Sequence, residues 1–151
     1  FGLYGVETQL KKALSRRVYL PSGGTLLLDP CEAGLVIDVN TAGDTARGGD
    51  PMLRANLEAA EEIARLLRLR RVGGIVLIDF IDMKEERHRD AVLARLKDAL
   101  RDDRTATEVL GFTRLGLVEM TRRRTEAALP AQKMAAGGTG GEELEGGEAD
   151  A

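Results

Sequence analysis

The sequence has no tryptophan, and aromatic residues make up only 3% of its 151 positions. Leu, Val, Ile and Ala must therefore fill the core, and a platform of several stacked aromatic rings for single-stranded bases is not expected. The single cysteine, Cys31, excludes an intrachain disulfide and a zinc site built from several cysteines of this chain. The lack of an intrachain disulfide fits a reducing, cytoplasmic setting. We expect Cys31 to pack as a small apolar side chain.

Long apolar runs are also missing. No stretch approaches the ~20 apolar residues of a membrane span, and no signal peptide opens the chain. The first residue is Phe1 rather than Met, which predicts that the chain was cut from a longer polypeptide. With 43% hydrophobic residues, the chain is predicted to be one domain or one piece of a larger protein.

The net charge of −3 is unevenly distributed. Residues 131–151 contain one of the 22 basic residues and five of the 25 acidic residues. Residues 1–130 therefore contain 21 basic and 20 acidic residues. The acidity therefore belongs to the end of the chain, which is rich in Gly, Glu and Ala. Such a composition predicts a disordered tail over residues 129–151 and a folded unit over residues 1–128.

Hydrophobic periodicity predicts an α/β (α+β) architecture, a mixed β-sheet with packed helices. Helices are expected at 6–14, 50–70 and 82–100, and strands at 18–20, 25–29, 32–39, 75–79, 105–112 and 115–120. Asp50 and Pro51 suit the start of the second helix, and Asp82 with Glu85 suits a cap for the third. Gly34 indicates a close backbone approach or a bulge. The run 75–79 is apolar up to its final residue, Asp79, which predicts a central strand covered on both faces.

Two of the predicted strands end on a carboxylate, Asp38 and Asp79. Strand residues two apart share a face, so Asn40 points the same way as Asp38. If the two strands are neighbours in register, all three side chains converge. Two close carboxylates repel unless a cation joins them, and Mg²⁺ is the expected ion because it takes oxygen ligands and keeps several waters. The alternative is that each Asp caps the next turn or helix.

Arginines near the ends of elements are candidates for phosphate contacts, because the guanidinium offers a planar donor fork. The cluster Arg122, Arg123 and Arg124 is the best candidate, and Arg17 is another. The alternative for each is a solvated surface. His88, the only histidine, is expected to be a surface residue rather than a catalytic base. No phosphate-binding loop motif is present.

Several motifs, in this order, resemble the catalytic subdomain of the ribonuclease E/G family. The resemblance covers about residues 1–124. The motifs are Leu20-Pro-Ser-Gly-Gly24, Ile37-Asp-Val-Asn40, Asn56-Leu-Glu-Ala-Ala-Glu-Glu-Ile-Ala-Arg65, Leu67-Arg-Leu-Arg70, Gly73-Gly-Ile-Val-Leu-Ile-Asp-Phe-Ile-Asp-Met83 and Leu115-Gly-Leu-Val-Glu-Met-Thr-Arg122.

The resemblance implies a deoxyribonuclease I-like subdomain and a Mg²⁺-dependent endoribonuclease. Such enzymes cleave single-stranded, often A/U-rich RNA and leave 5′-phosphate and 3′-hydroxyl ends. It implies that Asp38 and Asp79 bind the metal and that Asn40 assists the attacking water. Asp82 is not a metal ligand in the family.

This sequence also departs from the family pattern. The S1-type RNA-binding and 5′-end-sensing regions that precede this stretch in the family are absent, and so is the cysteine motif whose zinc links protomers. The resemblance alone therefore implies a homodimer. No zinc link between protomers is expected from this chain. Ala106 replaces an arginine of the family. A non-catalytic RNA-binding or assembly module and a phosphoesterase for small molecules are the competing hypotheses. The intact set Asp38, Asn40 and Asp79 favours catalysis over the non-catalytic module.

Overall fold

The computed structural model describes residues 15–41 and 50–125. The helix predicted at 6–14, the greater part of the loop that precedes Asp50 and the predicted tail lie outside the described residues. The boundary predicted between residues 128 and 129 lies outside them as well.

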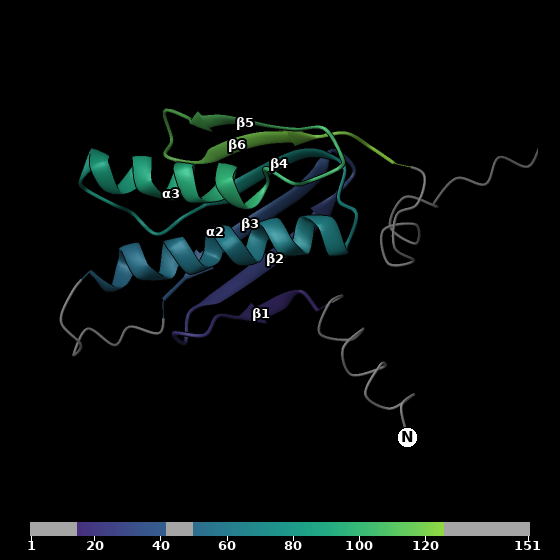
Figure 1. Cartoon of the computed structure of the whole chain (residues 1–151). Helices are drawn as coiled ribbons and strands as arrows, with labels where there is room; N and C mark the ends of the chain where they lie inside the picture. Colours follow the sequence, from purple (N-terminus) through teal and green to yellow (C-terminus); the bar gives the residue numbers. More distant parts are fainter. Residues whose placement is uncertain (1–14, 42–49, 126–151) are drawn as a thin grey trace, which may run out of the picture.

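A six-stranded mixed sheet organises the molecule, in the order β1-β2-β3-β4-β6-β5 (Figure 1). β3 and β4 are parallel, and the other neighbouring pairs are antiparallel. This confirms the predicted mixed sheet with packed helices, while the deoxyribonuclease I-like subdomain stays a prediction. The strands are β1 (Arg17–Tyr19), β2 (Thr25–Cys31), β3 (Gly34–Asn40), β4 (Gly74–Asp79), β5 (Thr107–Phe112) and β6 (Val118–Arg122).

The first described helix, α2 (Pro51–Leu69), is the crossover between the parallel strands β3 and β4. Its start follows the prediction: Asp50 is the N-cap, and Oδ1 of Asp50 accepts bonds from the backbone N–H groups of Met52 and Leu53, both at 3.1 Å. Pro51 occupies the first turn, where its missing N–H has no cost. These signals are local, so the sequence alone was sufficient to find them.

The second helix, α3 (Glu86–Ala99), starts later than predicted. Its N-cap is Glu85, which makes no side-chain capping bond. The prediction that Asp82 caps this helix is therefore wrong. The side chain of Asn56 bonds both the backbone N–H and the carbonyl of Ile81. These two bonds hold the chain after β4 in a non-helical path.

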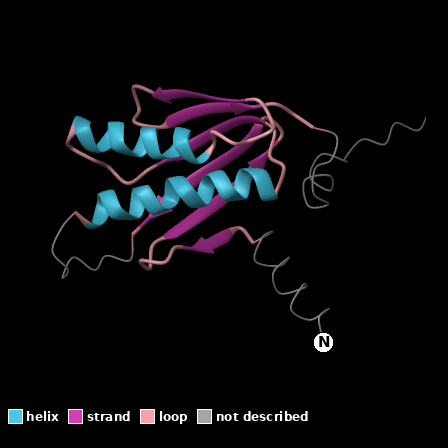
Figure 2. Cartoon of the chain, in the orientation of Figure 1, coloured by secondary structure: helices cyan, strands magenta, loops and turns pink. Residues whose placement is uncertain are grey.

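Both helices lie across one face of the sheet (Figure 2). Alternate strand residues are buried under them, and the intervening residues point away. Buried side chains on this side include Leu26, Leu28, Ile37, Val39, Val76, Ile78, Val118 and Met120 from the sheet and Ala60, Ile63, Leu67, Val92 and Leu96 from the helices.

We call the other side of the sheet the open face, formed by the alternate strand residues that point away from α2 and α3. Val36 is 41% exposed there and Ile75 is 50% exposed, and no element of the described part of the chain covers them. The prediction that β4 is covered on both faces is therefore wrong. A run of apolar residues shows that a strand tolerates burial, but the number of layers in the fold decides whether both faces are buried.

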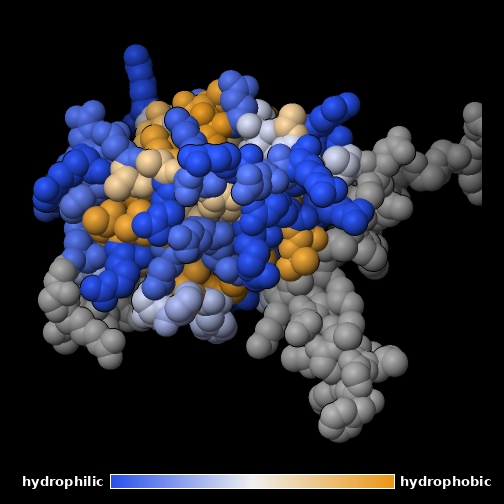
Figure 3. Space-filling view, in the orientation of Figure 1, coloured by the Kyte–Doolittle hydropathy of each residue, from blue (hydrophilic) through white to orange (hydrophobic). Residues whose placement is uncertain are grey.

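The outer surface of the helix layer is mostly hydrophilic, with scattered apolar patches (Figure 3). Its charges include Glu61 and Arg95, which pair at 2.7 Å between α2 and α3. Among the helices that the structure describes, none is both long and apolar enough to cross a membrane.

Gly34 lets β3 begin beside β4. Its φ is +153°, and a Cβ atom there would lie 1.8 Å from the carbonyl oxygen of Ile75. The predicted close backbone approach is confirmed. Only glycine fits this contact. The pairing of the two parallel strands begins there, with Gly34 opposite Ile75, and ends with Asp38 opposite Asp79.

Candidate active site

The paired strands β3 and β4 bring Asp38 and Asp79 together. The two residues are direct partners in the parallel register, so their backbones lie about 4.8 Å apart, one strand spacing. The buried neighbours Ile37 and Ile78, both fully inaccessible, point to the helix layer. Asp38 and Asp79 therefore point to the open face, and Asn40, two residues beyond Asp38, lies on the same face.

The electrostatics of Asp79 reflect this crowding. Partial burial of its carboxyl group is the largest cause that raises its pKa, followed by the negative charges of Asp38 and Asp82. The folded chain therefore favours the ionised form of Asp79 less than water favours that of a free aspartate. A bound cation would relieve both repulsions. Asp82 thus belongs to the electrostatic surroundings of Asp79, a role that helix capping had not suggested.

The donor set suits a hard divalent cation. Asp38, Asp79 and Asn40 offer only oxygen atoms as metal ligands, and the open face leaves room for water and for a ligand. In residues 15–41 and 50–125, no group of three or more His, Cys, Asp or Glu side chains is arranged to hold a metal ion. Mg²⁺ is commonly held by one or two carboxylates with several waters in the remaining positions, so two carboxylates fit this ion.

Asn56 holds the segment that follows Asp79. Its side chain is fully buried in α2. Nδ2 donates to the carbonyl of Ile81 at 2.9 Å, and Oδ1 accepts from the N–H of Ile81 at 3.0 Å. Sequence reasoning missed this residue, although the signal was present: an Asn lies on the apolar stripe of the helix, three residues after Leu53 and four before Ala60.

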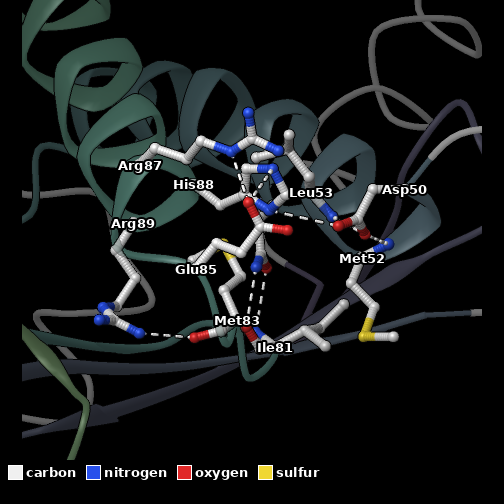
Figure 4. A network of polar contacts seen from close by, with 10 residues as sticks. Asp50, Met52, Leu53, Ile81, Met83, Glu85, Arg87, His88 and Arg89 are labelled. Carbon is white, nitrogen blue, oxygen red and sulfur yellow. Dashed lines mark hydrogen bonds and ion pairs between the residues drawn. The ribbon is translucent and has the colours of Figure 1, made fainter.

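His88 joins the starts of the two helices (Figure 4). Its Nδ1 lies 3.3 Å from Oδ2 of Asp50, the N-cap of α2, and its Nε2 lies 3.8 Å from Oε2 of Glu85. The side chain is only 15% exposed. His88 is therefore half-buried rather than fully exposed, because α3 turns its side chain toward the start of α2.

Arg122 is buried at the far end of β6. Its Nε and Nη2 donate to the carboxylate of Asp103 at 2.9 and 3.0 Å, and its Nη1 donates to the carbonyl of Val72 at 2.7 Å. The side chains of Arg122 and Asp103 are 4% and 3% exposed. Every guanidinium nitrogen is used inside the fold, which argues against the predicted contact of Arg122 with RNA.

The other predicted arginines are exposed, but they lie at two different ends of the sheet. Arg124 donates to the carbonyl of Glu32 at 2.5 Å, and Arg123 precedes it. Because Arg122 pairs with Gly74 at the start of β4, these residues lie roughly 17 Å along the strand from Asp79, at ~3.3 Å per residue. Arg17 instead pairs with Leu27, which pairs with Asp38, so Arg17 lies in the same cross-strand row as the two carboxylates.

The sequence of this chain was also compared with known proteins. The model of the ribonuclease E/G family matches residues 1–125, which include every described strand and helix. The chain belongs to the ribonuclease E/G family. It is 48% identical over 131 residues to Ribonuclease G of Salmonella typhimurium (strain SL1344) and of Escherichia coli (strain K12). It is also 48% identical over 132 residues to Ribonuclease E of E. coli K12.

Each of these matches covers 85% of this chain. The chain spans about a quarter of the length of the Ribonuclease G relatives, 27%, and 12% of this Ribonuclease E. The shared segment of the ribonuclease E/G family thus includes the sheet on which Asp38, Asn40 and Asp79 lie.

Proposed function

We propose that this chain is the catalytic core of a Mg²⁺-dependent endoribonuclease that cleaves single-stranded RNA and leaves 5′-phosphate and 3′-hydroxyl ends. The observation that supports it most is the parallel register of Asp38 and Asp79, with Asn40 on the same open face. Membership of a family whose relatives are named ribonucleases supports RNA as the substrate.

The two aspartates would hold the ion between them, each through a carboxylate oxygen. When bound there, Mg²⁺ would polarise the phosphodiester and lower the pKa of a bound water. Asn40 lies on the same face, two residues beyond Asp38, where its side-chain amide would hydrogen-bond and orient the attacking water. In the reaction the bond between phosphorus and the water oxygen forms, the bond from phosphorus to the 3′ oxygen breaks, and that oxygen takes up a proton.

The open face suits a polymeric substrate. An extended RNA strand can cross a sheet that no described element covers. Residues below the surface support the site: Val39 and Ile78 are buried under the helix layer, and Asn56 holds the segment after Asp79. These supports limit the reorganisation that the carboxylates need before a metal ion binds.

Cleavage of a 5′-monophosphorylated, A/U-rich RNA tests this function. We expect cleavage with Mg²⁺, none with a chelator, and products with 5′-phosphate and 3′-hydroxyl ends. Asp38→Asn and Asp79→Asn keep the shape of the side chain but remove its charge, and each should lower the rate by at least about 100-fold, the scale of lost electrostatic catalysis. Arg123→Gln is a matched control at the far end of the sheet. Cleavage that persists in chelator or in both Asn variants would contradict the proposal.

A further inference from the structure

Tyr19 is a large side chain that the fold leaves uncovered. It is 71% exposed, whereas Phe80, at the end of β4, is 4% exposed. Its neighbour Val18 packs against the core, so alternation along β1 directs Tyr19 to the open face. An exposed aromatic ring keeps apolar surface in contact with water, which is unfavourable in free energy. No element in the described part of the chain buries the ring of Tyr19.

The strand register locates Tyr19 beside the candidate active site. Tyr19 pairs with Thr25, and Thr25 pairs with Asn40. Direct cross-strand partners share a face, so Tyr19, Thr25 and Asn40 form one row on the open face. Two strand spacings separate Tyr19 from Asn40, about 10 Å. This corresponds to roughly three stacked nucleotides at ~3.4 Å each.

A cation stands next to this ring. Arg17 lies two residues earlier on the same edge strand and therefore on the same face. Its row contains Leu27, Asp38 and Asp79. Within the part of the chain that the structure describes, the guanidinium of Arg17 has no hydrogen bond or ion pair. An aromatic ring for a base beside a cation for a phosphate is the pair of contacts that single-stranded nucleic acids require.

We propose that Tyr19 stacks on a base of the RNA substrate, and that Arg17 contacts a phosphate of the same strand as it crosses the open face from β1 toward β4. This inference rests on the proposed function, because it assigns the substrate path of that site. Composition argued against a platform of several aromatic rings, and the structure agrees that no second exposed ring adjoins Tyr19 among the described residues. One ring at the edge of the sheet selects for an unpaired base a few nucleotides away from the reacting phosphate.

Fluorescence of Tyr19 measures this contact directly. The chain has no tryptophan and two tyrosines, so Tyr4→Phe leaves Tyr19 as the only tyrosine. We expect an A/U-rich single strand, added in chelator so that no cleavage occurs, to quench this fluorescence in a saturable way. An oligonucleotide of the same length with abasic residues should bind more weakly and quench less, since stacking needs a base.

Binding of a labelled RNA provides the quantitative test. Tyr19→Ala should raise Kd at least about five-fold, the lower end of the effect of one lost stacking contact, whereas Tyr19→Phe should stay within about two-fold. Leu115→Ala is the matched control, because Leu115 is also an exposed apolar residue, at 88%, but lies in the β5–β6 turn. Melting temperatures of the variants confirm that each one folds.

The outcomes separate this inference from the proposed function. Unchanged RNA affinity of Tyr19→Ala, an equal loss in Leu115→Ala, or failure of the chain to bind the strand would overturn the role of Tyr19. If the wild type cleaves RNA while Tyr19→Ala binds normally, the function stands and the stacking contact fails. If Tyr19 is quenched and Tyr19→Ala weakens binding but no variant cleaves RNA, the contact stands and the catalytic proposal fails.

Discussion

Three adjacent arginines at the end of β6 have different environments. Arg122 is enclosed with Asp103 and Val72, while Arg123 and Arg124 are exposed. Strand alternation directs Arg122 to the same side as the buried Met120. The sequence cannot show this difference, because the partner Asp103 lies 19 residues earlier and only the folded chain brings the two together.

The Arg122–Asp103 pair should stabilise the fold in a pH-dependent way. Burial alone would raise the pKa of Asp103, but hydrogen bonds from Arg122, Thr105 and Thr107 outweigh it and hold the pKa below its ordinary value of 3.8. The unfolded chain therefore binds this proton more tightly. The stabilisation is fully present well above pH 3.8 and is lost as the pH falls through the folded-state pKa.

Asp103→Asn tests this account. At pH 7 the variant should lose about 3 kcal/mol of unfolding free energy, because it leaves the buried guanidinium without its counter-charge. The difference from wild type should shrink below pH 3.8. Denaturant unfolding at several pH values measures both effects. Asp98→Asn is the control, since Asp98 pairs with Arg101 on the exposed surface. A loss no larger than that of the control would argue against a stabilising buried pair.

At the scale of elements, the contact between α2 and the end of β4 depends on Asn56. Asn56→Ala removes two hydrogen bonds and leaves the N–H and carbonyl of Ile81 without their partner. We expect a loss of about 2 kcal/mol in unfolding free energy and weaker Mg²⁺ affinity, because the segment after Asp79 is no longer held. Unfolding curves and metal titration measure the two effects.

Glu62→Gln is the control, because it loses only a pair with Arg65 on the same helix. If Asn56→Ala binds Mg²⁺ as tightly as the wild type does, the role of Asn56 is limited to stability.

The start of β3 provides a second test at this scale. Gly34→Ala would force a Cβ atom to within 1.8 Å of a backbone oxygen of β4, so the parallel pair must shift or separate. We expect the variant to lose most of its stability in thermal unfolding, or to fail to fold. Gly111→Ala is the matched control: Gly111 also has a positive φ, +114°, but has nothing within 4 Å of the added atom. Equal effects of the two substitutions would show that backbone strain, and not the contact with Ile75, is responsible.

Much of the element order was predictable because its signals are local. The start of α2 follows from Asp50 and Pro51, and alternation put Asp38 and Asn40 on one face. Contacts distant in sequence decided the rest. Asn56 fixes Ile81 and delays α3, β3 and β4 become neighbours only through the α2 crossover, and the one-sided helix layer leaves Ile75 exposed. The metal-site hypothesis therefore needed the register of two strands that lie some 40 residues apart, which periodicity cannot supply.

At the scale of the whole molecule, the one-sided sheet separates two groups of arginines. Arg17 shares a row with Asp38 and Asp79, whereas Arg123 lies near the opposite end of β4. Arg17→Gln should weaken RNA binding and reduce the magnitude of its salt-dependence slope by about one, and Arg123→Gln should do neither. Filter binding at several salt concentrations measures both slopes. The reverse pattern would move the RNA path to the far end of the sheet.

The proposed function requires that Asp38 and Asp79 together hold one divalent cation on the open face. Titration with Mn²⁺, a spectroscopically visible substitute for Mg²⁺, measures this by the loss of the free-ion magnetic resonance signal. We expect one Mn²⁺ site per chain, from which Mg²⁺ displaces the Mn²⁺. Affinity should fall at least about ten-fold in both Asp38→Asn and Asp79→Asn, since a single carboxylate remains in each. Wild-type affinity in either variant would contradict a shared site.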